Sequence, residues 1–273
     1  MQTQENAKSK NNFCVWLAAV AAVLVFGWSA TRPAAIGCNQ SELTTIPDAQ
    51  FVPQTVAAAQ QGEPEKLVCL TFDDGPSKNT PKVLDTLAKR GVPATFFVIA
   101  AENNEKFLPM IADEVAAGHQ IALHSASHDY KKIYQSPKAF WEDIDLLKEK
   151  ISPYVDVNSI NCLRFPGGST NTVSHKYGGS DIMKTLKTQA EEKGYHWIDW
   201  NVCAEDAVGG HPSAEQIYSN VINEVNGQNV CVVLMHDTAA TGSTVEALPA
   251  IIDWFQNEGY RFCTVEDMLA AKQ

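Results

Sequence analysis

The sequence has 273 residues, of which 45% are hydrophobic and 19% charged, a globular composition that excludes a disordered or collagen-like chain. Lysine and arginine number 21 against 32 aspartates and glutamates, so the formal net charge is -11. Because a chain this acidic, with no basic stripe, is repelled by phosphate backbones, nucleic acid is excluded as a partner.

The N-terminal part has the pattern of a membrane signal. Residues 13–30 are apolar without a single charge, and the polar leader 1–12 before them carries Lys8 and Lys10. A run of about 18 residues is near the lower limit for a helix that spans a bilayer. Positive flanking residues favour the cytoplasmic side. We therefore expect a single-pass signal-anchor at 13–30 in the cell membrane, with the rest of the chain outside the cytoplasm.

Two other interpretations of the apolar run stay open. It could be a long signal peptide that is cleaved, which would make the protein secreted, or it could precede lipid attachment at Cys38. Arg32 and Pro33, between the run and Cys38, disfavour the lipoprotein. Residues 31–66 are rich in Gln, Ala, Thr, Ser and Pro and are expected to be a linker. The folded domain is expected at 67–265, followed by a tail at 266–273.

After residue 66, short apolar segments alternate with amphipathic ones. The apolar runs predict seven buried strands, at 67–72, 94–99, 120–125, 160–165, 196–202, 230–236 and 260–265. Between them, helical spacing predicts four helices. Thr80 is expected to cap the first, Ser136 starts the second, Ser213 forms a capping box with Gln216 ahead of the third, and Thr244 precedes the fourth. Continuous apolar strands separated by helices indicate a parallel sheet covered by helices. Seven strands and about six helices favour an α/β fold of the distorted or partly open (β/α)7 barrel type over a doubly wound sheet.

The cysteines predict neither a zinc ribbon nor a thioredoxin-like site, because no two of them form a CxxC pair. Cys69, Cys231 and Cys263 each lie in an apolar, strand-like stretch. We expect them to be small buried side chains rather than members of a disulfide framework.

Side chains that can bind a metal or move protons follow five of the predicted strands. They are Asp73, Asp74, His124, His128, Arg164, Asp206 and His236. Functional residues of a parallel barrel gather at the C-terminal ends of its strands, so we expect these side chains to meet at one face. Two imidazoles with one carboxylate form a divalent-metal triad that leaves a coordination position for water, and zinc is the default ion.

Four motifs resemble those of a known family. They are Thr71–Pro76, His124–His128, Arg164–Gly168 and Leu234–His236. In this order they are similar to the motifs of polysaccharide deacetylases with a NodB-type domain, carbohydrate esterase family 4, which includes peptidoglycan and chitin deacetylases. The resemblance covers roughly residues 67–265. It implies a hydrolase that removes acetyl groups from a polysaccharide with the help of a divalent metal, zinc by default, with cobalt or another transition metal as alternatives.

The resemblance also implies a role for each catalytic residue. It assigns the metal to Asp74, His124 and His128, and makes Asp73 the general base that takes a proton from water. His236 becomes the general acid that protonates the departing amine, a role that suits an imidazole because its pKa lies near neutrality.

Further residues are expected to support the chemistry. By the resemblance, Arg164 positions Asp73, and Asp206 in turn holds Arg164. The Gly167 N–H group meets the developing oxyanion, and Leu234 lines the acetyl pocket.

Two side chains complete the expected substrate site. Pro166 belongs to the motif that begins at Arg164, and Trp200 is expected to pack near the barrel mouth. We expect the catalytic domain to act as a monomer.

The sequence departs from the family pattern at two places. Gly167 stands where a larger residue, often tyrosine, is common, so we expect a wider cleft there. Cys203 and Ala207 stand where the family often has an aspartate and a tryptophan. These departures affect the expected wall of the substrate groove more than the chemistry.

Three functions stay open at this point. The first is deacetylation of the amino sugars of peptidoglycan, which the expected membrane anchor favours. The second is a deacetylase or esterase of another acetylated glycan, such as chitin or xylan. The third is a surface module that binds glycan without turning it over, which the intact set of catalytic residues disfavours.

Overall fold

A computed structural model describes residues 65–271. The expected leader, membrane segment and nearly all of the expected linker lie outside these residues. Within residues 65–271, none of the helices combines the length and the apolar character that crossing a bilayer requires.

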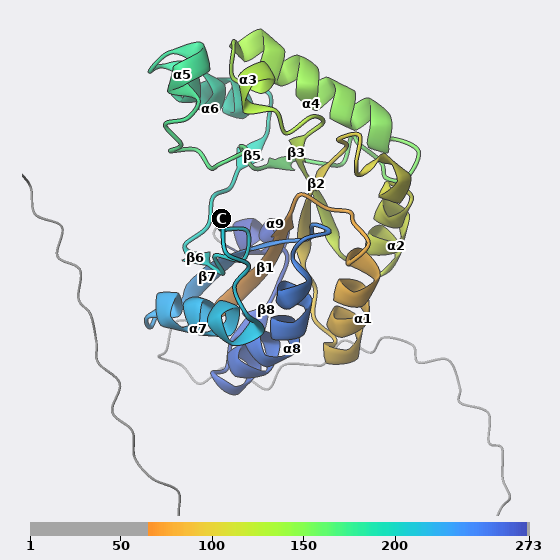
Figure 1. The fold of residues 1–273 in the computed structure, drawn as a ribbon, viewed down its shortest axis with the longest axis vertical. Helices are drawn as coiled ribbons and strands as arrows, with labels where there is room; N and C mark the ends of the chain where they lie inside the picture. The colour runs from red at the N-terminus through yellow and green to blue at the C-terminus, as the bar shows by residue number, and fades with distance from the viewer. Residues whose placement is uncertain (1–64, 272–273) are drawn as a thin grey trace, which may run out of the picture. The chain divides into compact units, whose positions relative to one another are not determined.

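The core is one parallel sheet with helices around it (Figure 1). Its strands are β1 (Leu67–Asp73), β2 (Thr95–Ile99), β3 (Gln120–Ser125), β4 (Cys162–Leu163), β5 (His196–Trp197), β6 (Val202–Cys203), β7 (Val230–His236) and β8 (Arg261–Phe262). The strand order is β5-β4-β3-β2-β1-β7-β6, and β8 pairs with the start of β1. The path ends at β5 on one side and β6 on the other, so the fold is a half-barrel, the open form of the expected architecture.

The expected strand at 196–202 is two strands on opposite sides of the opening. β5 pairs with β4, whereas β6 pairs with β7. Residues 198–201 connect the two edges, and their backbone bonds change partner on the way. The Ile198 N–H donates to the Leu163 carbonyl on one side, and the Asn201 N–H donates to the Val232 carbonyl on the other. The single apolar run therefore joins the two edges of the sheet.

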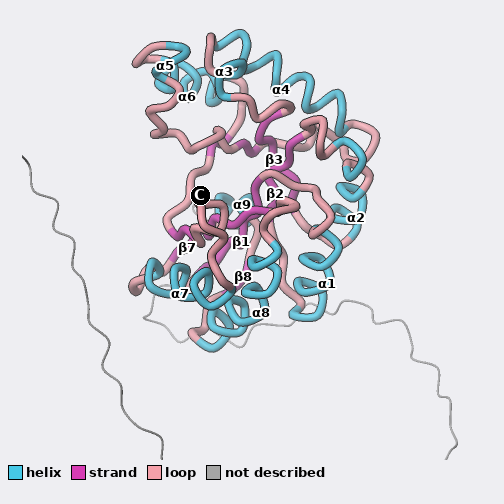
Figure 2. The backbone as a smooth tube through the Cα atoms, in the orientation of Figure 1, coloured by secondary structure: helices cyan, strands magenta, loops and turns pink. Residues whose placement is uncertain are grey.

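Helices cover the outer face of the sheet, as Figure 2 shows in cyan around the magenta strands. The helices of the described residues are α1 (Thr80–Arg90), α2 (Met110–Ala116), α3 (Tyr130–Ile133), α4 (Pro137–Ile151), α5 (His175–Gly178), α6 (Ile182–Glu192), α7 (Ala214–Val225), α8 (Gly242–Asn257) and α9 (Val265–Ala270), with a 3-10 turn, η1 (Glu105–Phe107). Of these, α9 packs on the inner face of the half-barrel instead. α8 packs against α7 and α1, and α4 packs against β3 and α6.

Each central strand buries both of its faces, which explains the continuous apolar runs in the sequence. On β1, Leu70 and Phe72 belong to the large core under the helices. Cys69 belongs to a smaller cluster on the inner face of the half-barrel. Because side chains alternate along a strand, Thr71 and Asp73 share this inner face with Cys69. The inner face is thus apolar at its base and polar where the strands end.

The capping signals have mixed outcomes. Ser213 and Gln216 form the expected capping box of α7, and Ser136 caps α4. The prediction for Thr80 is wrong, because this residue lies inside α1 and its hydroxyl donates instead to the Asp237 carboxylate at 2.5 Å.

The C-terminal end continues the folded domain. A tail was expected at 266–273, but residues 265–270 form α9. Thr264 and Asp267 make a capping box at its start, and Val265 and Met268 bury their side chains against the inner cluster. The expected burial of Cys69, Cys231 and Cys263 is confirmed.

Candidate active site

Strand register brings the catalytic candidates together at the C-terminal edge of the sheet. Asp73 is the direct neighbour of His236 across β1 and β7, and the pair two residues earlier joins Thr71 to Leu234. His124, near the end of β3, is 2% exposed, and Arg164, just after β4, is fully buried. As the sequence predicts, separate strand ends form one site.

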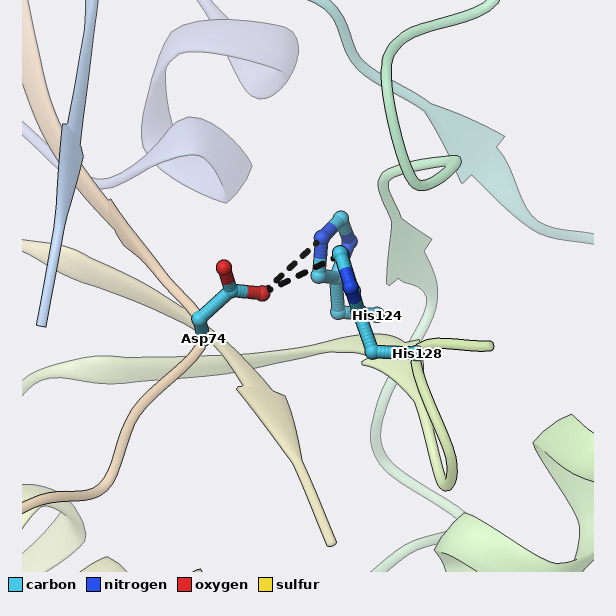
Figure 3. A group of neighbouring side chains, drawn as sticks. All are labelled: Asp74, His124 and His128. Atoms are coloured by element: carbon cyan, nitrogen blue, oxygen red, sulfur yellow. Dashed lines mark ion pairs between the residues drawn. The ribbon is translucent and has the colours of Figure 1, made fainter. Parts of the chain in front are cut away.

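Asp74, His124 and His128 converge on a common point (Figure 3). The Nε2 atoms of His124 and His128 lie 3.5 Å and 3.3 Å from Oδ1 of Asp74. One ligand atom from each residue lies within 4.8 Å of the other two. No other group of three or more His, Cys, Asp or Glu residues in the described part of the chain is so arranged.

The chemistry of these donors fits a divalent cation. Oδ1 of Asp74 is buried and accepts no hydrogen bond from the described residues, so a carboxylate oxygen is available at the centre of the group. Nδ1 of His124 lies 2.7 Å from the Arg164 carbonyl. A carbonyl can only accept, so Nδ1 carries the proton and the Nε2 lone pair faces Asp74. Burial lowers the pKa of both His124 and His128, which favours the neutral imidazole that ligates a metal.

Backbone geometry holds the two ligand-bearing loops in uncommon conformations. Asp74 and His128 have φ angles of 67° and 50°, in the left-handed region that side chains other than glycine rarely adopt. The Asn104 amide donates to the Asp74 and Pro76 carbonyls and fastens the first loop. Asp143, on α4, accepts from the Ser125 hydroxyl and from two backbone N–H groups of the second loop. The strained loops are therefore fixed before any ligand binds.

Arg164 binds Asp73, as expected. Nη1 of Arg164 donates to Oδ1 of Asp73 at 2.7 Å and to the Thr71 hydroxyl at 2.9 Å. The other carboxylate oxygen, Oδ2 of Asp73, lies 3.8 Å from Nε2 of His124. The remaining donors of Arg164 bind the Ile198 and Asp199 carbonyls. One oxygen of Asp73 is thus anchored, while the other lies toward His124.

The expected partner of Asp206 is wrong. Asp206 accepts from the backbone N–H and from Nδ1 of His236, both at 2.8 Å, and from the Thr244 hydroxyl. Arg164 takes its acceptors from β1 and from the segment after β5, so it needs no bond from Asp206. The reason lies in the sheet order, because β6 pairs with β7 and therefore places Asp206 beside His236.

This pairing controls the charge of His236. Desolvation alone lowers the pKa of an imidazole. The hydrogen bond to Asp206 and the charges of Asp206, Asp73 and Asp74 outweigh it and raise the pKa of His236 to about 9. His236 is consequently protonated at neutral pH and can donate a proton.

Gly167 and Gly168 form a turn that only glycine fits. Both have φ near 80°, and a Cβ on Gly168 would lie 3.1 Å from the Trp200 ring. The Gly167 N–H group has no hydrogen-bond acceptor among residues 65–271. The space that a side chain at position 167 would need is not left open. A Cβ there would lie 2.7 Å from Oη of Tyr130, which corrects the expectation of a wider cleft.

Two of the remaining expected residues, Pro166 and Trp200, lie at this turn, and the third, Leu234, lies on β7. The Pro166 carbonyl accepts from the Tyr134 hydroxyl at 2.7 Å. The Trp200 ring lies beside Gly168 and 5.6 Å from the Arg164 guanidinium. Leu234 is buried two residues before His236, on the same face of β7.

A cavity of about 270 Å³ borders the site. Its lining includes Asp74, His128 and Phe107.

Three supporting residues are absent from the sequence prediction. Asp143 braces the loop of His128, Tyr134 braces Pro166, and Asp199 accepts two hydrogen bonds from Ser169. Asp143 had a usable signal, because it lies on the apolar side of the predicted helix, next to Ile144 and three residues after Phe140. A carboxylate on a buried helix face needs a polar partner.

Comparison with known proteins identifies the family. A sequence model described as polysaccharide deacetylase matches residues 60–185. A peptidoglycan-N-acetylglucosamine deacetylase of Bacillus cereus is 29% identical over 270 residues, which cover 94% of this chain and 93% of that protein. A second enzyme of the same name from Bacillus cereus is 32% identical, with 76% of this chain and 90% of that protein covered.

Solved structures agree with the sequence comparison. The catalytic domain of a peptidoglycan N-acetylglucosamine deacetylase from Eubacterium rectale is 41% identical. It superposes with a TM-score of 0.70 over 78% of this chain and 93% of that one. The named relatives are peptidoglycan N-acetylglucosamine deacetylases, which are hydrolases acting on carbon–nitrogen bonds. The half-barrel and the side chains at its strand ends thus have the same explanation: the chain belongs to the polysaccharide deacetylase family.

Proposed function

We propose that the protein is a metal-dependent deacetylase that removes N-acetyl groups from the amino sugars of peptidoglycan. The observation that carries this proposal is the convergence of four groups at the C-terminal edge of the sheet. They are a three-ligand metal site, an anchored carboxylate, a protonated histidine and an unpartnered backbone N–H group. The similarity to peptidoglycan-N-acetylglucosamine deacetylases over most of their length supports the choice of polymer.

Asp74, His124 and His128 would hold the cation, and three protein ligands leave a position for substrate or water. A divalent cation bound there supplies Lewis-acid polarisation of the acetamide carbonyl and lowers the pKa of water. A bound cation also favours the charged form of Asp74, whose pKa is raised by burial.

The reaction itself follows from the positions of the protein groups. Oδ2 of Asp73 takes a proton from water while Arg164 keeps the carboxylate in place. The oxygen of that water forms a bond to the acetamide carbon, and the Gly167 N–H group donates to the developing oxyanion. His236 protonates the sugar nitrogen, the carbon–nitrogen bond breaks, and acetate and a free amine result.

Another acetylated glycan is the second candidate substrate. A bifunctional xylanase/deacetylase of Pseudobutyrivibrio xylanivorans is 31% identical over 76% of this chain. The same centre would cleave an acetyl ester, because addition of water to the carbonyl is common to both reactions. An alkoxide leaves more readily than an unprotonated amide nitrogen, so proton donation by His236 matters less for the ester.

The test is release of acetate from three polymers, namely peptidoglycan, chitin oligomers and acetylated xylan, each with and without chelator. We expect release from peptidoglycan at the highest kcat/KM, abolished by chelator and restored by zinc. Undiminished activity after verified metal removal would refute the metal dependence, and a preference for xylan would refute the polymer. Asp73→Asn is the inactive control, since it removes the base.

A further inference from the structure

Tyr130 presents a hydroxyl group to the active site. This residue begins α3, two positions after His128, and its ring packs edge-on against the His128 ring with centroids 5.6 Å apart. Oη of Tyr130 lies 2.7 Å from the point where a Cβ of Gly167 would stand. The hydroxyl therefore lies against the main chain of the turn that carries the expected oxyanion donor.

The two tyrosines of this region differ in the use of their hydroxyls. Tyr134 is buried, and its hydroxyl donates to the Pro166 carbonyl at 2.7 Å, a bond that braces the turn. Tyr130 is half-buried, and its hydroxyl makes no hydrogen bond with any residue from 65 to 271. A polar group directed at a partly enclosed site without a protein partner is available to a ligand.

Two unused donors consequently lie side by side. The Gly167 N–H group lacks an acceptor in the described part of the chain, and the Tyr130 O–H group lies next to the same Cα atom. Oxyanion sites commonly combine a backbone N–H with a side-chain donor such as tyrosine. Glycine at position 167 is what makes this possible, because any side chain there would occupy the place of the hydroxyl.

We infer that the Tyr130 hydroxyl is a second oxyanion donor, which hydrogen-bonds the acetyl carbonyl oxygen together with the Gly167 N–H group. The inference rests on the proposed function to the extent that an acetyl carbonyl must bind in this site. It does not depend on the polymer. A donor of this kind acts mainly when negative charge develops, so it increases kcat more than it lowers KM.

The test is Tyr130→Phe, which keeps the ring and its contact with His128 and removes only the oxygen. Kinetics are measured on an N-acetylglucosamine oligomer and on 4-nitrophenyl acetate, because both reactions form an oxyanion. We expect kcat to fall at least about tenfold on both substrates, with KM within about twofold. Metal content and Tm should match the wild type. Tyr154→Phe is the matched control, because Tyr154 follows α4 at the opposite end of the sheet.

A second pair of variants tests the contact without activity. Gly167→Ala places a methyl group against Oη of Tyr130, so it should lower Tm more in the wild type than in the Tyr130→Phe background.

The outcomes separate the two proposals. If kcat of Tyr130→Phe stays within twofold, or if only KM rises, the role of Tyr130 is refuted. If the wild type cleaves 4-nitrophenyl acetate but no N-acetyl glycan, only the proposed function is contradicted. The kinetics of Tyr130→Phe on the ester then still test the role of Tyr130. If the wild type is inactive on both substrates, both proposals are contradicted.

Discussion

Replacing Asp206 by Asn should move the alkaline limit of activity to lower pH. Asp206 is the hydrogen-bond partner of Nδ1 in His236, and its bond and charge are the largest of the effects that raise the pKa of that imidazole to about 9, ahead of the charges of Asp73 and Asp74. Asparagine keeps an acceptor oxygen for the His236 N–H and the Thr244 hydroxyl. The NH₂ group of the asparagine then faces Nδ1 of His236. Because an NH₂ group can only donate, this hydrogen bond needs an unprotonated Nδ1 and therefore favours the neutral imidazole.

The size of the effect follows from the pKa. Without the Asp206 charge, the pKa of His236 should return to the ordinary value of about 6.5 or below, a change of about 3 kcal/mol in favour of the neutral form. At pH 7.5 about 97% of His236 is protonated with a pKa of about 9, but only about 9% with a pKa of about 6.5. A required general acid would therefore lose about tenfold in kcat/KM at this pH, with little loss below pH 6.

The assay is a pH profile of kcat/KM for acetate release from wild type and Asp206→Asn, with metal content measured at each pH. A raised pKa means that the active, protonated form persists until pH rises through that value, so the wild-type profile should fall on its alkaline side. A cation near Asp73 and Asp74 offsets part of their charge, so the wild-type limit lies at or below pH 9. An alkaline limit at the same pH in both proteins would refute the role of Asp206.

Three further predictions concern the base, the core and the location. Asp73→Asn should nearly abolish turnover with metal content unchanged, whereas Asp74→Ala should lose both; equal metal loss in the two variants, measured by elemental analysis, would show that the roles are misassigned. Glu114 is fully buried, neither of its carboxylate oxygens has a hydrogen-bond partner among the described residues, and burial raises its pKa well above 4.5. Since ionised Glu114 destabilises the fold as pH rises, the Tm advantage of Glu114→Gln over wild type should grow from pH 5 to pH 8, and a pH-independent difference would contradict this. Fractionation with N-terminal sequencing should find the protein in the membrane with residues 13–30 retained, and a soluble form that starts near residues 31–38 would indicate a cleaved signal peptide.

The grouping of Asp74, His124 and His128 could be predicted from the sequence because its information is local. Asp74 directly follows an apolar strand, and His124 and His128 flank the end of another, so parallel pairing alone brings them together. The same reasoning located Asp73 and His236.

The partner of Asp206 could not be predicted in this way. It depends on which strands are neighbours in the sheet. The break inside the run 196–202 determines this, because it lets β6 leave β5 and pair with β7. Strand propensity does not reveal such a break, because Trp197 on one side of it and Val202 on the other both favour strands. Tyr130 was missed for a similar reason, since its hydroxyl meets Gly167 only through the packing of α3 on the loop after β4.

The connection between β5 and β6 sets a constraint on evolution that differs from that of the catalytic side chains. Its carbonyls at Ile198 and Asp199 hold the buried guanidinium of Arg164, and every amino acid supplies a carbonyl. Point substitutions in this stretch can therefore leave the support of Asp73 intact. Insertion or deletion of one residue cannot, because it shifts the carbonyls away from Arg164 or detaches β6 from β7. For the support of Arg164, the number of residues between the two sheet edges, rather than their identity, should be what selection preserves.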